Sequence, residues 1–276
     1  MLKHARISRR FLLPLALAIS LLFAFVPAAL VVTHAQSPSL RLFGPKQHYL
    51  ALGDSLAYGL QPNCSTTCTH GYVNDLFPIL QSEGTKDVTN LGCPGETSTS
   101  FIGGGICPYP TQTPSQLETA VAFLKTHPGK VSPVTLDIGS NDMLPDLIGC
   151  TASSNFGTDL ARLDNNLTQV ILPQLRAALT VNGRVTGSIV MMNYYNPFPN
   201  CLASAQFTQA FNEFNTHLAT DVSTFGFIVD VLGAFGGITT PNICTYTWIC
   251  TVRDIHPTDL GYNVIANTFA AAIPPN

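Results

Sequence analysis

Four residues in this sequence have the chemistry that acyl transfer requires. Ser55 lies in a Gly-Asp-Ser-Leu segment, Asn141 in Gly-Ser-Asn-Asp and His256 in Asp-Ile-His-Pro, while Gly95 follows Cys-Pro in a turn-forming segment. A hydroxyl nucleophile, an imidazole base, a side-chain amide and a backbone N–H that can bind an oxyanion are the parts of such a site. Together they predict a serine-dependent acyl-transfer site.

Each of these residues also has a purely structural explanation. Ser55 and Asn141 could cap helices, and His256 could lie in a surface loop before a proline. Gly95 could serve only a tight turn, in which case Gly92 would be the alternative oxyanion donor. The catalytic interpretation is favoured because all four segments fall in loops after predicted strands.

The elements that must position these residues alternate along the chain. Apolar stretches predict strands, and apolar residues at helical spacing predict helices. The predicted strands are residues 48–53, 87–91, 131–139, 184–195 and 226–232. The predicted helices are residues 72–80, 115–125, 160–179, 205–222 and 258–272, with a kink at Pro173. This alternation implies parallel strands joined by crossover helices, and hence a three-layer α/β/α sandwich.

The order of these motifs resembles that of the GDSL, or SGNH, hydrolase family of esterases and lipases, from about His48 to the last helix. The resemblance implies a flavodoxin-like sheet of five parallel strands. It also implies that Ser55 is the nucleophile and His256 the base, and that the N–H groups of Ser55 and Gly95 and the Asn141 side chain bind the oxyanion. We therefore expect a secreted serine carboxylic-ester hydrolase, an esterase or lipase, that forms an acyl-serine intermediate without a metal or organic cofactor.

The residue that orients the histidine departs from the family pattern. The family usually has an aspartate three residues before the histidine, and that position is Arg253 here. Either Asp254, two residues before His256, completes a triad, or the backbone carbonyl of Arg253 orients the imidazole in a dyad. We favour the dyad, because an offset of two residues points the Asp254 side chain elsewhere.

Residues 1–35 are typical of an export signal. The first ten residues are rich in basic side chains, and residues 11–32 are almost wholly apolar. Small residues precede a cut near Ala35, so we expect cleavage there and a secreted hydrolase domain of residues 36–276. The apolar stretch is also long enough for the alternative of an uncleaved membrane anchor.

The charge of the chain argues against nucleic acid as a partner. The full chain has 13 basic and 16 acidic residues, and residues 1–35 hold four of the basic ones and no acid, so the exported chain has a net charge of about −7. Without a run of Lys or Arg, no patch attracts nucleic acid or anionic lipid. We expect one α/β domain, a monomer with no stable membrane span, and a small-molecule, lipid or acylated-carbohydrate ester as substrate.

Eight cysteines follow the export signal, and an even number in an exported chain favours disulfides over a metal site. They are Cys64, Cys68, Cys93, Cys107, Cys150, Cys201, Cys244 and Cys250. Our hypothesis is that they pair sequentially, because each pair would then close a loop after a strand. A zinc site would need paired Cys-x-x-Cys or His spacings, which the sequence lacks.

Several alternatives stay open at this stage. The segment around Ser55 is close to the Gly-x-Ser-x-Gly elbow of α/β-hydrolases, but those reach their nucleophile only after several strands. An exported binding module without catalysis could keep the same fold. A carbohydrate deacetylase of the same family shares the catalytic residues of an esterase, so the substrate is undecided. Tyr194 and Tyr195, after the fourth strand, are candidates for an acyl pocket or for packing.

Overall fold

The structure, a computed structural model, describes residues 40–62, 64, 68, 70–109 and 114–275. The chain from Leu40 onward forms one compact unit. The predicted export signal, residues 1–35, lies outside the described residues. In the part that is described, no helix is both long and apolar enough to cross a membrane.

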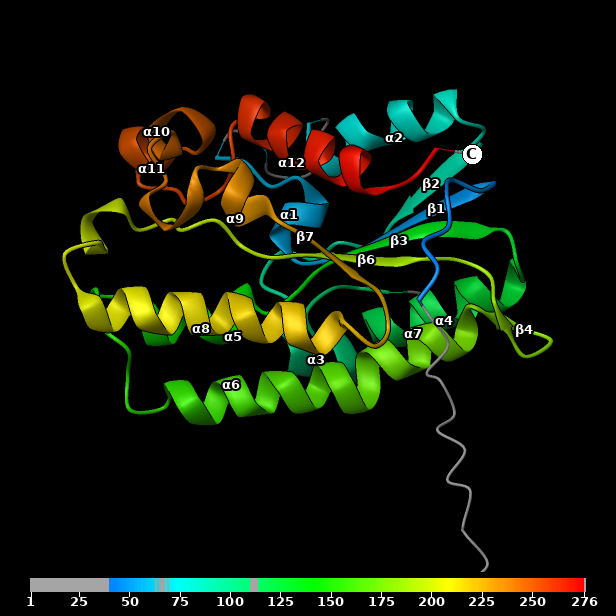
Figure 1. The fold of residues 1–276 in the computed structure, drawn as a ribbon, viewed down its shortest axis with the longest axis horizontal. Helices are drawn as coiled ribbons and strands as arrows, with labels where there is room; N and C mark the ends of the chain where they lie inside the picture. The colour runs from blue at the N-terminus through cyan, green and yellow to red at the C-terminus, as the bar shows by residue number, and fades with distance from the viewer. Residues whose placement is uncertain (1–39, 63, 65–67, 69, 110–113, 276) are drawn as a thin grey trace, which may run out of the picture. The chain divides into compact units, whose positions relative to one another are not determined.

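Five parallel strands form the central sheet, in the order β2-β1-β3-β6-β7 (Figure 1). The strands are β1 (His48–Gly53), β2 (Asp87–Asn90), β3 (Val131–Asp137), β6 (Ile189–Met192) and β7 (Phe227–Val229). Every neighbouring pair is parallel. The central strand β3 is buried along its whole length, as expected for a sheet covered on both faces. The five-stranded parallel sheet predicted from the sequence is confirmed.

Helices cover both faces of this sheet and complete the three predicted layers. In Figure 1, α2 and α12 lie on one face, and α4, α7 and α8 lie on the other. Their bounds are α2 (Tyr72–Ser82), α4 (Gln116–Thr126), α7 (Leu172–Ala178), α8 (Ala205–Val222) and α12 (Asp259–Ala272). Within the layers, α2 packs against α12 and α4 packs against α7. The buried apolar residues of helices and strands form one core.

The order of the strands determines where loops can meet. After β1 the chain adds β2 on one side, and it then crosses over to add β3 on the other side of β1. In open parallel sheets of this kind, ligands bind at the carboxyl ends of the strands where the order reverses. The segments that follow β1 and β3 therefore meet at one crevice.

The helix predicted over residues 160–179 is interrupted. The helix α6 (Phe156–Asn165) continues into a π-helix, η1 (Asn166–Ile171), and only then into α7. Pro173, near the start of α7, has no N–H to donate to the carbonyl four residues earlier. The helix widens ahead of the proline, so the irregularity is a π-helical turn rather than the kink that we expected at Pro173.

Several short elements gave no clear signal in the sequence. A small antiparallel hairpin joins β4 (Thr180–Val181) to β5 (Arg184–Val185), with positive φ angles at Asn182 and Gly183. The short helices are α1 (Ser55–Tyr58), α3 (Ser98–Gly103), α5 (Ser140–Leu147), α9 (Val231–Ala234), α10 (Ile243–Tyr246), α11 (Ile249–Val252), η2 (Pro199–Cys201) and η3 (Gly237–Thr239). Elements of this length show too little of the helical period to be recognised.

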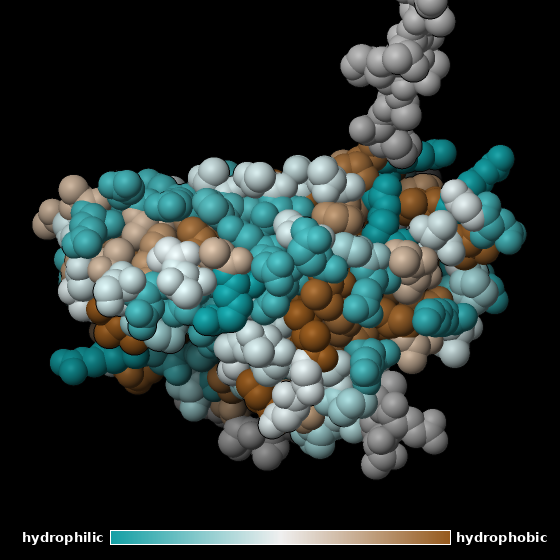
Figure 2. Space-filling view, turned by 90° about the horizontal axis from the view of Figure 1, so that it is seen from below, coloured by the Kyte–Doolittle hydropathy of each residue, from teal (hydrophilic) through white to brown (hydrophobic). Residues whose placement is uncertain are grey.

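One face of the molecule shows how polar and apolar side chains are distributed on the surface. The face shown in Figure 2 carries hydrophilic side chains over most of its area, with apolar residues in separate patches. Among the described residues, the large apolar side chains that are well exposed are Ile106, Ile148, Val252 and Leu260. The apolar residues of the chain are used chiefly in the core and in the cavity described below.

Candidate active site

Ser55 lies in a tight turn at the end of β1. Gly53 ends the strand with a φ of +141°, and a Cβ atom there would lie 2.2 Å from the carbonyl oxygen of Asp137, so a side chain does not fit. The carboxylate of Asp54 accepts the N–H of Leu56 at 2.9 Å and caps α1. Ser55 is thus the first residue of a helix that starts at the carboxyl end of the sheet.

His256 reaches Ser55 from the other end of the chain. Its Nε2 lies 2.9 Å from the Ser55 Oγ, although the two residues are 201 positions apart. The backbone of His256 is held in place because its carbonyl accepts the N–H of Trp248 at 3.1 Å. The structure therefore brings together, at hydrogen-bond distance, the two residues that the sequence paired as nucleophile and base.

Asp254 contacts the other side of the imidazole. Its Oδ1 lies 2.6 Å from Nδ1 of His256 and also accepts the backbone N–H of His256 at 2.8 Å. The second contact is an Asx turn, in which an aspartate binds the N–H two residues later. Because a carboxylate only accepts hydrogen bonds, Nδ1 carries the proton and Nε2 is left to accept from Ser55.

The geometry contradicts the reason that we gave for preferring a dyad, because the Asp254 side chain does contact the imidazole. We expected the offset of two residues to turn the Asp254 carboxylate away and to leave the carbonyl of Arg253 next to His256. Instead, Arg253 has a left-handed backbone with a φ of +60° and turns the chain just ahead of Asp254. The Asx turn then folds the carboxylate back onto the imidazole, and the three side chains form a Ser-His-Asp arrangement.

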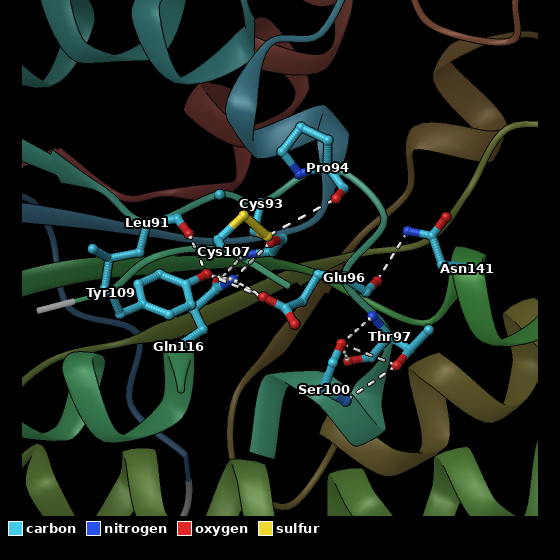
Figure 3. Close-up of a disulfide and its surroundings, with 12 residues drawn as sticks. Leu91, Cys93, Pro94, Glu96, Thr97, Ser100, Cys107, Tyr109, Gln116 and Asn141 are labelled. Carbon is cyan, nitrogen blue, oxygen red and sulfur yellow. Dashed lines mark hydrogen bonds between the residues drawn. A yellow bond between two sulfur atoms is a disulfide. The ribbon is translucent and has the colours of Figure 1, made fainter. Parts of the chain in front are cut away.

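Gly95 and Asn141 line the same cavity as Ser55 and His256. Gly95 has a φ of +82° with open space around it, and no hydrogen bond among the described residues uses its N–H. The Asn141 side chain donates one N–H to the carbonyl of Glu96 at 2.9 Å (Figure 3). An amide nitrogen carries two hydrogens, so the second remains for a ligand. Together with the N–H of Ser55 at the start of α1, these donors could bind an oxyanion.

Gly92, the alternative donor, is already engaged. Its N–H donates to the side-chain oxygen of Asn90 at 2.9 Å. A Cβ atom at Gly92 would lie 2.4 Å from the backbone nitrogen of Tyr58, which shows that this glycine serves the close packing of the loop on α1. The geometry thus favours Gly95 over Gly92 as an oxyanion donor.

An apolar cavity of about 160 Å³ adjoins these polar groups. Its apolar lining comes from α1 and the residues that follow it, from α5 and α8, and from the loops after β6 and before α12. These residues are Leu56, Leu60, Met143, Leu144, Leu147, Tyr194, Tyr195, Pro197, Phe211, Phe214 and Ile255. The sequence suggested Tyr194 and Tyr195 as candidates, whereas the residues of α5 and α8 resemble any core-facing positions of a helix.

Two buried carboxyls lie next to the serine turn. Asp137, the last residue of β3, accepts the N–H groups of Asp54 and Ala57 on its Oδ2, each at 3.1 Å. The hydroxyl of Tyr72 donates to the Oδ1 of Asp137 at 2.6 Å. Burial, and then the neighbouring carboxyl of Asp54, raise the pKa of Asp137 well above its usual value. Asp137 thus binds backbone N–H groups on both sides of Ser55 and holds the turn in place.

Asp54 links this turn to two other segments. Its Oδ2 accepts the hydroxyl of Ser140 at 2.6 Å and that of Tyr194 at 3.0 Å. Our sequence reasoning did not identify Asp137 as part of the site. The signal that could have found it is an acidic residue inside the otherwise apolar stretch 131–139, because a buried acid needs partners to be retained.

All eight cysteines form disulfides, and the pairing is sequential. The bonds join Cys64 to Cys68, Cys93 to Cys107, Cys150 to Cys201 and Cys244 to Cys250. Cys93 is two residues from Gly95, so this disulfide anchors the candidate oxyanion loop (Figure 3). Within the described ranges, no group of three or more His, Cys, Asp or Glu side chains is arranged to hold a metal ion.

Known proteins share this arrangement of elements. The GDSL-like lipase/acylhydrolase family matches residues 51–264 of the chain. The lipase Lip_vut3 from a goat rumen metagenome is 18% identical, with a TM-score of 0.61 over 82% of this chain and 96% of that one. The acetylxylan esterase Axe2 from Geobacillus stearothermophilus is 16% identical, with a TM-score of 0.57 over 84% and 96% of the two chains.

A third solved structure, TesA, is 20% identical, with a TM-score of 0.55 over 83% of this chain and 99% of that one. At these identities, the likeness of all three structures concerns the fold. No curated protein sequence matches the chain.

Proposed function

The chain belongs to the GDSL-like lipase/acylhydrolase family of ester hydrolases, and we propose that it cleaves carboxylic esters through an acyl-serine intermediate on Ser55. The observation that carries this proposal is the 2.9 Å contact between the Ser55 Oγ and the His256 Nε2. The carboxylate of Asp254 on the opposite ring nitrogen supports it, because a nucleophilic serine needs an oriented base.

In the first step, the Oγ of Ser55 bonds to the carbonyl carbon of the ester while the Nε2 of His256 takes the hydroxyl proton. Asp254 stabilises the imidazolium, and the negative charge on the former carbonyl oxygen is bound by the N–H groups of Ser55 and Gly95 and by the Asn141 amide. The imidazolium then gives its proton to the leaving alcohol as the carbon–oxygen bond breaks.

In the second step, water releases the acyl group. The Nε2 of His256 takes a proton from water as the water oxygen attacks the acyl carbon, and the same three donors bind the second oxyanion. Collapse of this intermediate breaks the bond to Ser55, whose Oγ regains a proton from the imidazolium. The products are a carboxylic acid and the free enzyme, so no metal or organic cofactor is needed for the balance.

The apolar cavity points to the acyl half of the substrate. A space of about 160 Å³ lined mostly by aliphatic and aromatic side chains suits an acyl chain longer than acetyl. Deacetylation of a carbohydrate, the reaction named for the structural neighbour Axe2, is the second candidate, and it would leave most of this cavity unfilled. We therefore favour an esterase or lipase over a deacetylase.

Export and domain organisation form part of the same proposal. Residues 1–35 act as a signal that is cleaved near Ala35, and residues 36–276 are one secreted hydrolase domain that works as a monomer. The four disulfides support an oxidising compartment, since such bonds persist mainly in exported proteins.

A fluorophosphonate probe tests the proposed mechanism directly. We expect the exported protein to gain the mass of one adduct, with peptide mapping locating it on Ser55, because only an activated serine reacts with this class of probe. The His256→Ala variant should remain unlabelled under the same conditions. Folded wild-type protein that takes up no probe would contradict the proposal and would favour an exported binding module instead.

A further inference from the structure

The side chain of Gln116 forms a junction beneath the candidate site. Gln116 is fully buried at the first position of α4, and its Oε1 accepts the N–H of Gly53 at 2.6 Å. Its Nε2 donates to the carbonyl of the same glycine at 2.9 Å. Gly53 is two residues before Ser55, so Gln116 satisfies both backbone groups of the residue from which the serine turn starts.

The same amide contacts the loop that carries Gly95. The Nε2 of Gln116 lies 3.1 Å from the Oε2 of Glu96 and 2.8 Å from the hydroxyl of Tyr109 (Figure 3). The Tyr109 hydroxyl in turn lies 3.0 Å from the Oε2 of Glu96. Glu96 directly follows Gly95 and is only 1% exposed, which is rare for a carboxylate and indicates that its contacts matter.

The Asn141 side chain, the third candidate donor, also bonds Glu96. The backbone carbonyl of Glu96 accepts one N–H of the Asn141 side chain at 2.9 Å, which leaves the other N–H for a ligand. Ser55, Gly95 and Asn141 follow three different strands, so their relative positions depend on a link between loops. Gln116 and Glu96 provide that link.

We propose that Gln116 is a positioning residue for the oxyanion hole. Through Gly53 and Glu96, it fixes the N–H of Ser55, the N–H of Gly95 and the Asn141 amide relative to one another, so that all three donors serve one developing negative charge. This inference rests on the proposed ester hydrolysis. Hydrogen-bond donors lower the barrier only when they are already placed where the charge develops. A buried glutamine at this junction therefore acts on catalysis as well as on stability.

The Gln116→Leu variant tests the proposal, because leucine fills a similar volume and can make none of the hydrogen bonds of the Gln116 amide. We expect kcat to fall about 10- to 100-fold with KM within about threefold of wild type, since small displacements of catalytic groups cost up to about 10²-fold in rate. Circular dichroism and thermal unfolding would establish that the variant is folded. An unchanged kcat in the folded variant, or a loss seen only in KM, would overturn the proposal.

Tyr49→Phe is the matched control for a general effect of core polarity. The Tyr49 hydroxyl is fully buried and bonds the Thr135 side chain at 2.9 Å, and no hydrogen bond in the described part of the chain joins it to Gln116, Glu96 or Tyr109. We expect this control to lower the melting temperature and to leave kcat unchanged.

Tyr109→Phe, which removes one contact of the junction and keeps the fold, should instead lower kcat by about 3- to 10-fold. A Tyr109→Phe variant with the kcat of the control would contradict the proposal even if Gln116→Leu did not fold.

Two further measurements separate a positioning role from a structural one. Glu96→Gln keeps an acceptor for Gln116 and should lose much less kcat than Glu96→Leu. Asn141→Ala alone should cost about 10² to 10³ in kcat. In the Asn141→Ala background, Gln116→Leu should lower kcat by a smaller factor than it does in the wild type. The reason is that one of the donors that Gln116 helps to place is already absent. Fully multiplicative losses would overturn the proposal, whereas a wild-type protein without esterase activity or probe labelling would overturn the proposed function itself.

Discussion

The orientation of His256 depends on a single turn of backbone. Arg253 adopts a left-handed conformation, and Asp254 then bonds both the backbone N–H and the ring Nδ1 of His256 with one oxygen. A side chain that serves the backbone and the imidazole at once is fixed more firmly than one that contacts the ring alone. The short spacing between the acid and the histidine is thus compatible with a triad.

Replacing Asp254 by asparagine should slow the enzyme strongly without unfolding it. The neutral amide does not stabilise the imidazolium as a carboxylate does, so we expect kcat to fall by at least about 10²-fold and at most about 10⁴-fold. Steady-state kinetics on a simple ester would measure this loss. Asp259→Asn, an exposed change just after the site, is the control and should keep its activity. A loss of less than about tenfold in Asp254→Asn would show that another group orients His256.

At the scale of elements, a second pair of carboxyls joins two helices away from the cavity. Asp164 on α6 and Asp221 on α8 interact, and the Nδ1 of His217 on α8 lies 2.8 Å from the Oδ2 of Asp164. Burial and the neighbouring charge of Asp164 raise the pKa of Asp221 to about 7, and His217 opposes part of this shift. Between about pH 4 and about pH 7, Asp221 is therefore protonated in the folded protein and ionised in the unfolded chain.

This proton makes the stability of the α6–α8 contact depend on pH. Because the pKa of Asp221 is higher in the folded state, its contribution is most favourable below about pH 4 and is lost as the pH rises to about 7. Asp221→Asn should therefore raise the melting temperature at pH 8 and change it much less at pH 5. Glu213→Gln, an exposed change on the same helix, should shift neither value. If Asp221→Asn shifted the melting temperature equally at both pH values, the raised pKa of Asp221 would be contradicted.

At the scale of the whole molecule, the order of the strands brings the residues of the candidate site together. Because the strand order reverses between β1 and β3, the loop with Ser55 and the helix with Asn141 meet at one crevice. The loop before α12 brings His256 to the same place, and α5 and α8 close the apolar cavity beside it. Residues from the whole length of the domain thus form one site.

The shape of this cavity predicts a dependence on acyl length. Each methylene buried is worth about 0.8 kcal/mol, so kcat/KM for monomeric p-nitrophenyl esters should rise up to about fourfold per added carbon from acetate until the cavity is filled. It should then fall for longer chains. Leu144→Trp, which narrows the cavity, should move the maximum to shorter chains. A maximum at acetate in the wild type would instead favour the deacetylase.

The sequence by itself determined the class of the protein. Strand and helix periodicity are local properties of the chain, and they predicted the five strands and most long helices. The order of the serine, asparagine and histidine segments predicted the family, which the match over residues 51–264 confirmed. The even number of cysteines and their positions led to the pairing that the structure contains.

Only the tertiary structure decided how the site is assembled. The contact of Asp254 with the imidazole depends on a left-handed residue and an Asx turn, and neither has a reliable signature in one sequence. Asp137 and Gln116 act on the loops of Ser55 and Glu96 from positions far away in the chain. The cavity is likewise lined by α5 and α8, whose sequences show only the pattern of helices that pack against a core. Contacts of this kind depend on how distant segments pack, and packing is a property of the folded chain rather than of any local pattern.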